Sequence, residues 1–375
     1  MTTHSTHSLR GRWRDEARLR ICLVANARFP IRQPFIGGLE SMTWHLARGL
    51  RRRGHEVALF AAPGSDPALD VEKLPLTPTQ GNAGRRHSGR NDVDAPEWIE
   101  ASEHVAYQRL LADLSAGERH FDVLHNNSLH PLPLAEAASL PMPVLTTLHT
   151  PPLAAMEKAI RTGGGRPAFT AVSEFTARSW APLVDASCVP NGVDTDLWPA
   201  GPGGDTAVWS GRLVPEKAPH QAIDAARHAG VALVLAGPVL DDAYFAAEIR
   251  PRLGGRVICA GHLRQPALAQ LVGRSSVAVV TPDWDEPFGL VAAEALACGT
   301  PVAAYARGGL PEVVGRHGSF APAGDVVTLG QAIREARGLD RRAARRHAER
   351  HLSVATMVER YEDHYRLLLD TGVAA

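Results

Sequence analysis

The chain has 375 residues, of which 45% are hydrophobic and 21% charged, so it can build two domains of ordinary size with packed cores. Acidic and basic residues number 40 each, a balance that gives no electrostatic reason to expect nucleic acid or an anionic membrane as a partner. No apolar run approaches the roughly 20 residues of a membrane-spanning helix. The four cysteines have no ligand-like spacing, which favours reduced thiols in the cytoplasm over a zinc site.

The predicted elements begin after an N-terminal segment that is polar and rich in arginine. Residues 1–18 lack the apolar core of a signal peptide, so we expect a disordered extension. The apolar run Ile21–Ala25 predicts a buried strand, and an amphipathic helix is expected over residues 39–53. A second strand follows at His55–Phe60. The Gly-, Pro- and Asp-rich stretch 64–95 predicts one long surface loop.

Short apolar runs alternate with helix-like segments along the rest of the chain. Several runs lack polar alternation, which is typical of strands buried on both faces of a parallel sheet. The alternation restarts after the Gly- and Pro-rich segment 199–205, which has the composition of a linker. Beyond those named above, the predicted strands are Val123–Leu124, Val144–Leu148, Phe169–Val172, Val208–Trp209, Val231–Ala236, Val257–Ala260 and Val277–Thr281.

The pattern therefore predicts an α/β protein with two Rossmann-like parallel-sheet domains, at residues 19–190 and 191–350. Residues 351–375 contain apolar side chains at helical spacing, and we expect this last helix to pack back on the first domain. Ligands of open parallel sheets bind beyond the carboxyl ends of the strands, so the expected site is the cleft between the domains.

The segment 281–301, TPDWDEPFGLVAAEALACGTP, has the composition of a phosphate-binding strand–loop–helix unit. A helix is expected from Phe288 to Ala297, and Gly289 lets the backbone approach a ligand closely. The amides of Phe288, Gly289 and Leu290 would lie in the first turn, where unpaired N–H groups and the helix dipole favour phosphate.

Two glutamates flank this predicted phosphate site. Glu294 lies about one and a half turns into the helix, where its carboxylate can accept hydrogen bonds from both hydroxyls of a ribose. Glu286 precedes the helix and can reach the sugar itself. Two glutamates eight residues apart also occur on ordinary surface helices, so the pattern is informative only with the FG between them and the ACGTP that follows.

With these neighbours, the segment resembles the signature of the retaining family 4 glycosyltransferases, which have the GT-B fold of two Rossmann-like domains. Eight further segments match the family in order, and the resemblance spans roughly residues 20–370. They are IGGLE (36–40), RGHEV (53–57), FDVLH (121–125), TLHTPP (147–152), AVSE (171–174), PNGVD (190–194), WSGRLVPEK (209–217) and ARGGLPEVV (306–314).

Two other features are consistent with a donor that carries a diphosphate. Arg212 and Lys217 follow the first predicted strand of the second domain, where a cationic pair can stabilise a leaving nucleoside diphosphate without a metal. Gly37 and Gly38 open the first predicted helix, so that its amides can face the donor phosphates across the cleft. The plain structural interpretations are two surface cations and an ordinary turn.

The first domain is expected to hold the acceptor. Related enzymes usually carry a second histidine two residues after the one in DVLH, facing the reacting sugar, and here Asn127 occupies that place. An asparagine can hydrogen-bond to sugar hydroxyls but cannot act as a general base. His125 is more typical of a packed residue at a strand end than of a catalyst. His130 and His149 are candidates for contacts with the sugar or the acceptor.

Metals and redox cofactors are not expected. Two Asp-x-Asp patterns occur at 194–196 and 283–285, and such pairs bind Mn²⁺ or Mg²⁺ in the glycosyltransferase architecture that has one Rossmann-like domain. Because two such domains are predicted here, we interpret these residues as loop acids. No GxGxxG follows the first strand, which disfavours a nicotinamide enzyme, and the absence of GxxxxGK[ST] excludes a P-loop kinase.

The resemblance implies a metal-independent hexosyltransferase that moves a sugar from an NDP-sugar, with UDP as the commonest nucleotide, to a small soluble molecule or a glycan. Retention at the anomeric carbon is part of what the resemblance implies. Two alternatives stay open. Asn127 suggests a nucleotide-sugar-binding protein without transferase activity, and the same fold also supports a nucleotide-sugar epimerase, which would need no acceptor.

Overall fold

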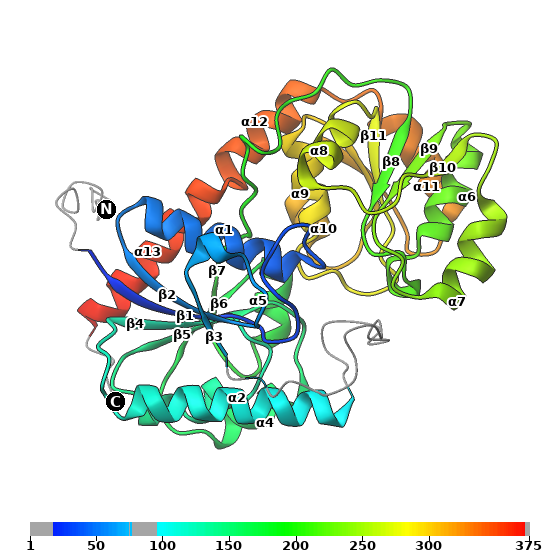
Figure 1. The fold of residues 1–375 in the computed structure, drawn as a ribbon. Helices are drawn as coiled ribbons and strands as arrows, with labels where there is room; N and C mark the ends of the chain where they lie inside the picture. Colours follow the sequence, from blue (N-terminus) through cyan, green and yellow to red (C-terminus); the bar gives the residue numbers. More distant parts are fainter. Residues whose placement is uncertain (1–17, 75, 77–95, 372–375) are drawn as a thin grey trace, which may run out of the picture.

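The computed structural model describes residues 18–74, 76 and 96–371, and within them two parallel sheets form the centres of two domains (Figure 1). The predicted α/β class with two Rossmann-like sheets is confirmed. The first sheet has the strand order β3-β2-β1-β4-β5-β6-β7. Its strands are β1 (Arg20–Val24), β2 (Glu56–Ala61), β3 (Val71–Lys73), β4 (Val123–Asn126), β5 (Val144–Leu148), β6 (Ala168–Ala171) and β7 (Ala186–Cys188).

The second sheet has the order β10-β9-β8-β11-β12-β13. In both sheets the order reverses beside the first strand of the domain, between β1 and β4 and between β8 and β11. Loops leaving two such strands diverge to opposite sides and open a crevice at their carboxyl ends. The strands are β8 (Ala207–Ser210), β9 (Leu233–Ala236), β10 (Val257–Cys259), β11 (Val277–Val280), β12 (Val302–Tyr305) and β13 (Gly318–Ala321).

Helices cover both faces of each sheet. In the first domain they are α1 (Gly38–Arg52), α2 (Glu97–Ser115), α3 (Leu132–Ala135), α4 (Ala154–Thr162) and α5 (Glu174–Trp180). In the second they are α6 (Pro219–Ala229), α7 (Asp242–Tyr244), α8 (Gln265–Gly273), α9 (Leu290–Ala297), α10 (Leu310–Val314), α11 (Val326–Ala336) and α12 (Arg341–His351), and α13 (Val354–Asp370) ends the described chain. Shorter turns are η1 (Pro67–Leu69), η2 (Ala137–Ser139), η3 (Pro215–Lys217), η4 (Phe245–Ile249), η5 (Arg250–Arg252) and η6 (Gly315–His317).

Alternation along β1 determines the two layers of the first domain. Ile21 and Leu23 lie in a core with α1 and α13, whereas Cys22 and Val24 lie in a second core with α2. Figure 1 shows α1 and α13 on one side of this sheet and α2 and α4 on the other. A strand whose successive side chains are all buried therefore has no polar position, as the uninterrupted apolar run predicted.

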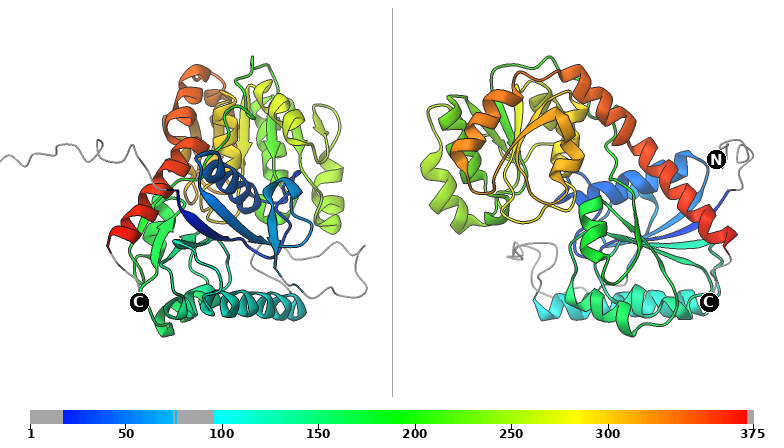
Figure 2. Two further views of the ribbon diagram at one scale, coloured as in Figure 1. Left: turned by 60° about the vertical axis from the view of Figure 1, so that its left-hand side comes forward. Right: turned by 180° about the vertical axis from the view of Figure 1, so that it is seen from behind.

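The last helix ties the two domains together. The helix expected within residues 351–375 is α13, which packs on α1 of the first domain, while the preceding α12 packs on α9 of the second (Figure 2). Burial of an apolar side chain stabilises by about 1.5–3 kcal/mol, so the row on α13 is a substantial anchor. Its members are Met357, Val358, Tyr361, Tyr365 and Leu368.

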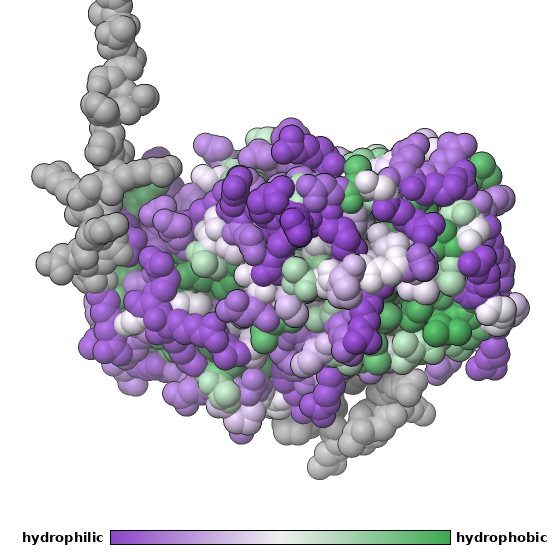
Figure 3. All heavy atoms as spheres, turned by 90° about the horizontal axis from the view of Figure 1, so that it is seen from above, coloured by the Kyte–Doolittle hydropathy of each residue, from purple (hydrophilic) through white to green (hydrophobic). Residues whose placement is uncertain are grey.

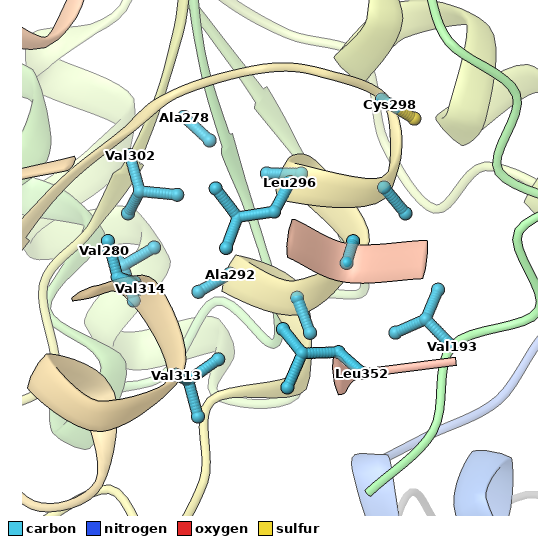
Figure 4. Close-up of a cluster of buried hydrophobic side chains, with 14 of the residues drawn as sticks. Val193, Ala278, Val280, Ala292, Leu296, Cys298, Val302, Val313, Val314 and Leu352 are labelled. Atoms are coloured by element: carbon cyan, nitrogen blue, oxygen red, sulfur yellow. The ribbon is translucent and has the colours of Figure 1, made fainter. Parts of the chain in front are cut away.

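In the second domain, α9 is held between the sheet and α10. Figure 4 shows Ala292 and Leu296 of this helix among side chains of β11, β12 and α10. Both residues are fully buried. The sequence of α9, LVAAEALA, is apolar nearly all round because neighbours cover most of its surface.

The structure corrects three expectations about the chain. The stretch 64–95 is not a single loop, because it contains η1 and β3, which pairs in parallel with β2; residues 75 and 77–95 lie outside the described part. Strands β7, β12 and β13 were not predicted, since they are short and carry Ala, Ser or Gly. The segment 199–205 packs on the second domain, where Gly201 N donates to Cys298 O at 3.0 Å.

The predicted N-terminal extension lies almost wholly outside the described residues. None of the helices within residues 18–74 and 96–371 combines the length and the apolar character needed to cross a membrane. The face of the molecule seen in Figure 3 is mostly hydrophilic, with hydrophobic residues in small groups between the polar ones.

The chain crosses between the domains at two adjacent points. Val193 N donates to Leu352 O at 2.7 Å, and Val354 N donates to Val193 O at 3.1 Å. A methyl group on Gly192 would lie 2.6 Å from Val354 Cα and 2.9 Å from Ser353 O, so only glycine allows this approach.

We expect Gly192→Ala to lower the free energy of unfolding by about 1–3 kcal/mol, because the clash is with backbone that cannot rotate away. Urea titration measures this change. Gly338→Ala is the control, since the nearest atom to its added methyl is Glu335 O at 3.5 Å. Equal stability of the two variants would contradict the close approach.

Candidate functional site

A cleft of about 250 Å³ lies between the domains, at the carboxyl ends of the strands that flank both points of reversal. The loops after β1, β8 and β11 supply much of its lining. Ten of the predicted site residues line it: Gly37, Gly38, His149, Arg212, Lys217, Glu286, Phe288, Gly289, Leu290 and Glu294.

The N-terminus of α9 opens into this cleft. The helix begins at Leu290, two residues later than expected, because Gly289 adopts a left-handed conformation with φ of +88°. Ala292 N makes the first bond to this turn, donating to Gly289 O at 2.9 Å. The amides of Gly289 and Leu290 precede that bond, so they belong to the donor groups that a helix leaves for an anion.

The N-terminus of α1 faces the same space from the first domain. Gly37 is its N-cap residue and Gly38 its first residue. The position of a Cβ on Gly38 lies 3.7 Å from the Cβ of Leu290, so the two helices begin close to each other across the cleft. Because both helix dipoles present their positive ends there, the arrangement favours a ligand with two adjacent negative groups.

Two cations from the second domain reach this space. Arg212 follows β8 and is 9% exposed, and Lys217 lies in η3. Lys217 Nζ lies 2.5 Å from Glu286 Oε2. Thr281, directly after β11, fixes the turn, since its hydroxyl donates to the carbonyl oxygen of Lys217 at 3.0 Å. Lys217 is thus held between the loops that follow β8 and β11.

The Asp-x-Asp pairs are engaged within the protein. Arg307 contacts both Asp283 and Asp285, at 3.3 Å each. Asp194 Oδ1 accepts a hydrogen bond from the amide of Asp196 at 3.0 Å, as in a tight turn. Within residues 18–74, 76 and 96–371, no group of three or more His, Cys, Asp or Glu side chains has an arrangement that could hold a metal ion.

Glu294 lies on the face of α9 that lines the cleft. Burial raises the pKa of its carboxyl group from the ordinary 4.5 to about 8. A group of this kind can exchange hydrogen bonds with a diol in either protonation state, because the neutral acid donates as well as accepts.

Of the polar residues predicted in the first domain, His149 is the one that lines the cleft, and Asn127 lies behind it. Asn127 is fully buried, and its Oδ1 accepts from His149 Nε2 at 2.9 Å. Burial lowers the pKa of His149 to about 3, so the ring is neutral at physiological pH. With its proton on Nε2, the ring keeps Nδ1 as an acceptor.

The other two histidines lie elsewhere. His125 is fully buried, with its ring nitrogens 2.7 Å from the hydroxyl of Tyr365 and 2.8 Å from that of Thr147, which is consistent with the packed residue that the sequence suggested. His130 does not line the cleft. Its ring packs on Tyr107 of α2 with the centroids 4.8 Å apart, and its Nδ1 accepts from the amide of Leu132.

Sequence reasoning assigned no role to Ser173 and Glu312, although both lie in matched segments. Ser173 is the N-cap residue of α5 in the first domain, and its hydroxyl donates to Pro287 O of the second domain at 2.5 Å. Glu312 of the second domain accepts from the amides of Glu174 at 2.8 Å and Phe175 at 2.6 Å. The loop that carries Glu286 is therefore held partly by the other domain.

Comparison with known proteins identifies the family. Residues 36–197 match Glycosyltransferase Family 4, and residues 200–349 match Glycosyl transferases group 1. The chain belongs to glycosyltransferase family 4. Within this family, it is 28% identical over 346 residues to glycogen synthase from Mycobacterium tuberculosis, covering 80% of this chain and 82% of the relative. It is also 28% identical over 375 residues to D-inositol 3-phosphate glycosyltransferase from Mycolicibacterium smegmatis, with coverages of 87% and 84%.

Solved structures confirm the GT-B fold expected of the family. AviGT4, a glycosyltransferase involved in avilamycin A biosynthesis, has a TM-score of 0.69 at 25% identity and covers 94% of this chain and 98% of its own. Sucrose-phosphate synthase from Thermosynechococcus elongatus has a TM-score of 0.73 at 20% identity, with coverages of 95% and 100%. Anabaena HepE in complex with UDP and glucose has a TM-score of 0.69 at 19% identity, with coverages of 93% and 100%.

The raised pKa of Glu294 makes a prediction about stability. The pKa of Glu294 in the folded protein, about 8, exceeds its ordinary value of 4.5. The stability that comes from burying this carboxyl group in its neutral form is therefore fully present below pH 4.5 and is lost as the pH rises through 8. We expect Glu294→Gln, which stays neutral, to be more stable than the wild type at about pH 9 and to differ much less at about pH 5.

Urea unfolding at both pH values measures the difference. Glu359→Gln, which removes an exposed carboxylate from α13, is the control for loss of one negative charge. A stability difference for Glu294→Gln that is the same at both pH values would contradict the burial argument.

Proposed function

We propose that this protein transfers a hexosyl group from an NDP-sugar, with UDP as the nucleotide, to a small molecule or a glycan, with retention and without a metal ion. The observation that carries this proposal is the convergence in one cleft of two helix N-termini, at Gly37 and Gly289, with Arg212 and Lys217. Together they form a fixed positive environment for a diphosphate, which is the group that leaves during transfer.

The donor roles follow from position along the cleft. The amides of residues 288–290 and the N-terminus of α1 bind the diphosphate, and Arg212 and Lys217 stabilise the charge that develops on it. Glu294, one turn into α9, binds the ribose. Glu286 precedes the helix and is paired with Lys217, so it is suited to bind the sugar and to keep that lysine in place.

The acceptor side is supplied by the first domain. His149 presents a neutral ring to the cleft, and Asn127 holds that ring through its Nε2. We assign Asn127 as a positioning residue, and His149 as the contact to the reacting groups. In the retaining mechanism implied by the family resemblance, the leaving phosphate takes the proton of the acceptor hydroxyl, so no side chain has to act as the base.

The relatives support the donor and acceptor classes. HepE was solved with UDP and glucose, and the sequence relatives are named for glycogen synthesis and for transfer to D-inositol 3-phosphate. For this protein we propose only the same classes of substrate: a UDP-hexose as the donor and a polyhydroxylated molecule as the acceptor.

Lys217→Ala and Arg212→Ala are expected to lower kcat by about 100-fold or more, because each removes preorganised charge from the leaving group. The assay is acceptor-dependent release of nucleotide across a panel of NDP-hexoses. Lys158→Ala, on an exposed position of α4 outside the cleft, is the matched control and should retain wild-type turnover.

Near-wild-type turnover in either cleft variant would overturn the assignment. The same assay separates the alternatives. A binding protein would retain donor affinity without releasing nucleotide, and an epimerase would convert the donor with no acceptor present.

Transfer is expected to survive exhaustive treatment with EDTA, because charge on the leaving diphosphate is met by cationic side chains and helix dipoles. Initial rates before and after chelation give the comparison. A complete loss of activity that Mn²⁺ or Mg²⁺ restores would mean that a metal takes part.

A further inference from the structure

The loop after β11 alternates between the outside of the domain and the cleft. Asp283 and Asp285 have side chains that are 65% and 53% exposed and are held by Arg307. Trp284 and Glu286, the residues between and after them, line the cleft. The contacts of Arg307 with the two aspartates hold the loop on both sides of the indole, which lines the cleft.

The indole is fixed from two further directions. Asp283 N donates to Glu216 O at 2.8 Å, which ties the loop to η3. Lys217 Nζ lies 5.0 Å from the centroid of the Trp284 ring, close enough for a cation–π contact. The ring is thus placed before any ligand enters.

The edge of this ring carries a polar group whose partner is missing from the protein. Trp284 Nε1 is buried and has no hydrogen-bond partner among residues 18–74, 76 and 96–371. Trp44, Trp180 and Trp209 each donate their indole N–H, to Asp66, Thr150 and Thr281 respectively. A buried donor without an acceptor is unfavourable, so its retention in a ligand cleft indicates that the ligand supplies the acceptor.

We propose that Trp284 Nε1 donates a hydrogen bond to one hydroxyl oxygen of the sugar being transferred, and so selects the donor by that hydroxyl. This inference rests on the proposed transferase function. An indole N–H can only donate and an ionised carboxylate can only accept. Trp284 and Glu286, two residues apart on one loop, therefore match a hydroxyl group, which accepts from the first and donates to the second.

The position along the loop favours the sugar over the phosphates. The amides assigned to the diphosphate lie at residues 288–290, at the start of α9, and Trp284 lies on the far side of Glu286 from them. The ring also contacts Lys217, whose ammonium group is paired with Glu286. Trp284 thus belongs with the residues that we assign to the transferred group.

The test uses Trp284→Phe, which keeps the aromatic face toward Lys217 and removes the N–H. The donors are the NDP-hexose that the wild type turns over fastest and its monodeoxy analogues, each lacking one hydroxyl. We expect kcat/KM for the parent donor to fall by about 10-fold or more. For the analogue that lacks the hydroxyl bound by Trp284, kcat/KM of the wild type should already be lower by this factor. Trp284→Phe should not lower kcat/KM for that analogue any further.

Trp209→Phe is the matched control, because it makes the same substitution at a buried indole whose N–H is bonded to Thr281. It is expected to lower stability while its discrimination among the analogues stays that of the wild type. Equal losses by Trp284→Phe on the parent donor and on every analogue, or no loss at all, would overturn the inference and leave the proposed function intact. A wild type that transfers from no donor would overturn both.

Discussion

The site depends on one arrangement, the meeting of two helix N-termini across the interdomain cleft. Gly289 makes it possible in the second domain, because its left-handed conformation turns the chain from β11 into α9 at a point that lines the cleft. Packing of α9 between the sheet and α10 keeps that end in place. Electrostatic stabilisation of a leaving diphosphate requires such preorganisation, since donors that must reorient during the reaction give up part of their effect.

The contacts between domains act on the same loop. From the first domain, Ser173 donates to the carbonyl of Pro287, and within the second domain the amide of Gly309 donates to the carbonyl of Glu286 at 2.7 Å. Glu312 joins α10 to the start of α5. These bonds connect the position of the first domain to the geometry of the residues that we assign to the donor. A second connection between the domains is made by the last two helices, since α13 packs on α1 of the first domain and α12 packs on α9 of the second.

Some polar residues beside the cleft line it, and others support those that do. The paired aspartates and Arg307 are framework for the loop, while Trp284 and Glu286 face the cleft. In the first domain, Asn127 fixes the ring of His149, which lines the cleft. A substitution at Asn127 is thus expected to act through that ring.

The sequence by itself determined the class of fold, and it named the residues of the second domain that line the cleft. Both depend on local pattern: apolar runs for buried strands, and a glycine before an apolar helix for the loop that opens α9. It did not predict β3 and β7, which have three residues each, or β12 and β13, which contain Ala, Gly and Ser and so give a weak strand signal. The burial of Asn127, the position of His130 against α2 and the bond from Ser173 to Pro287 were decided by tertiary structure alone. Each of these features depends on contacts between residues that are far apart in the chain. The spacing of residues along the sequence does not indicate which distant side chains will come into contact.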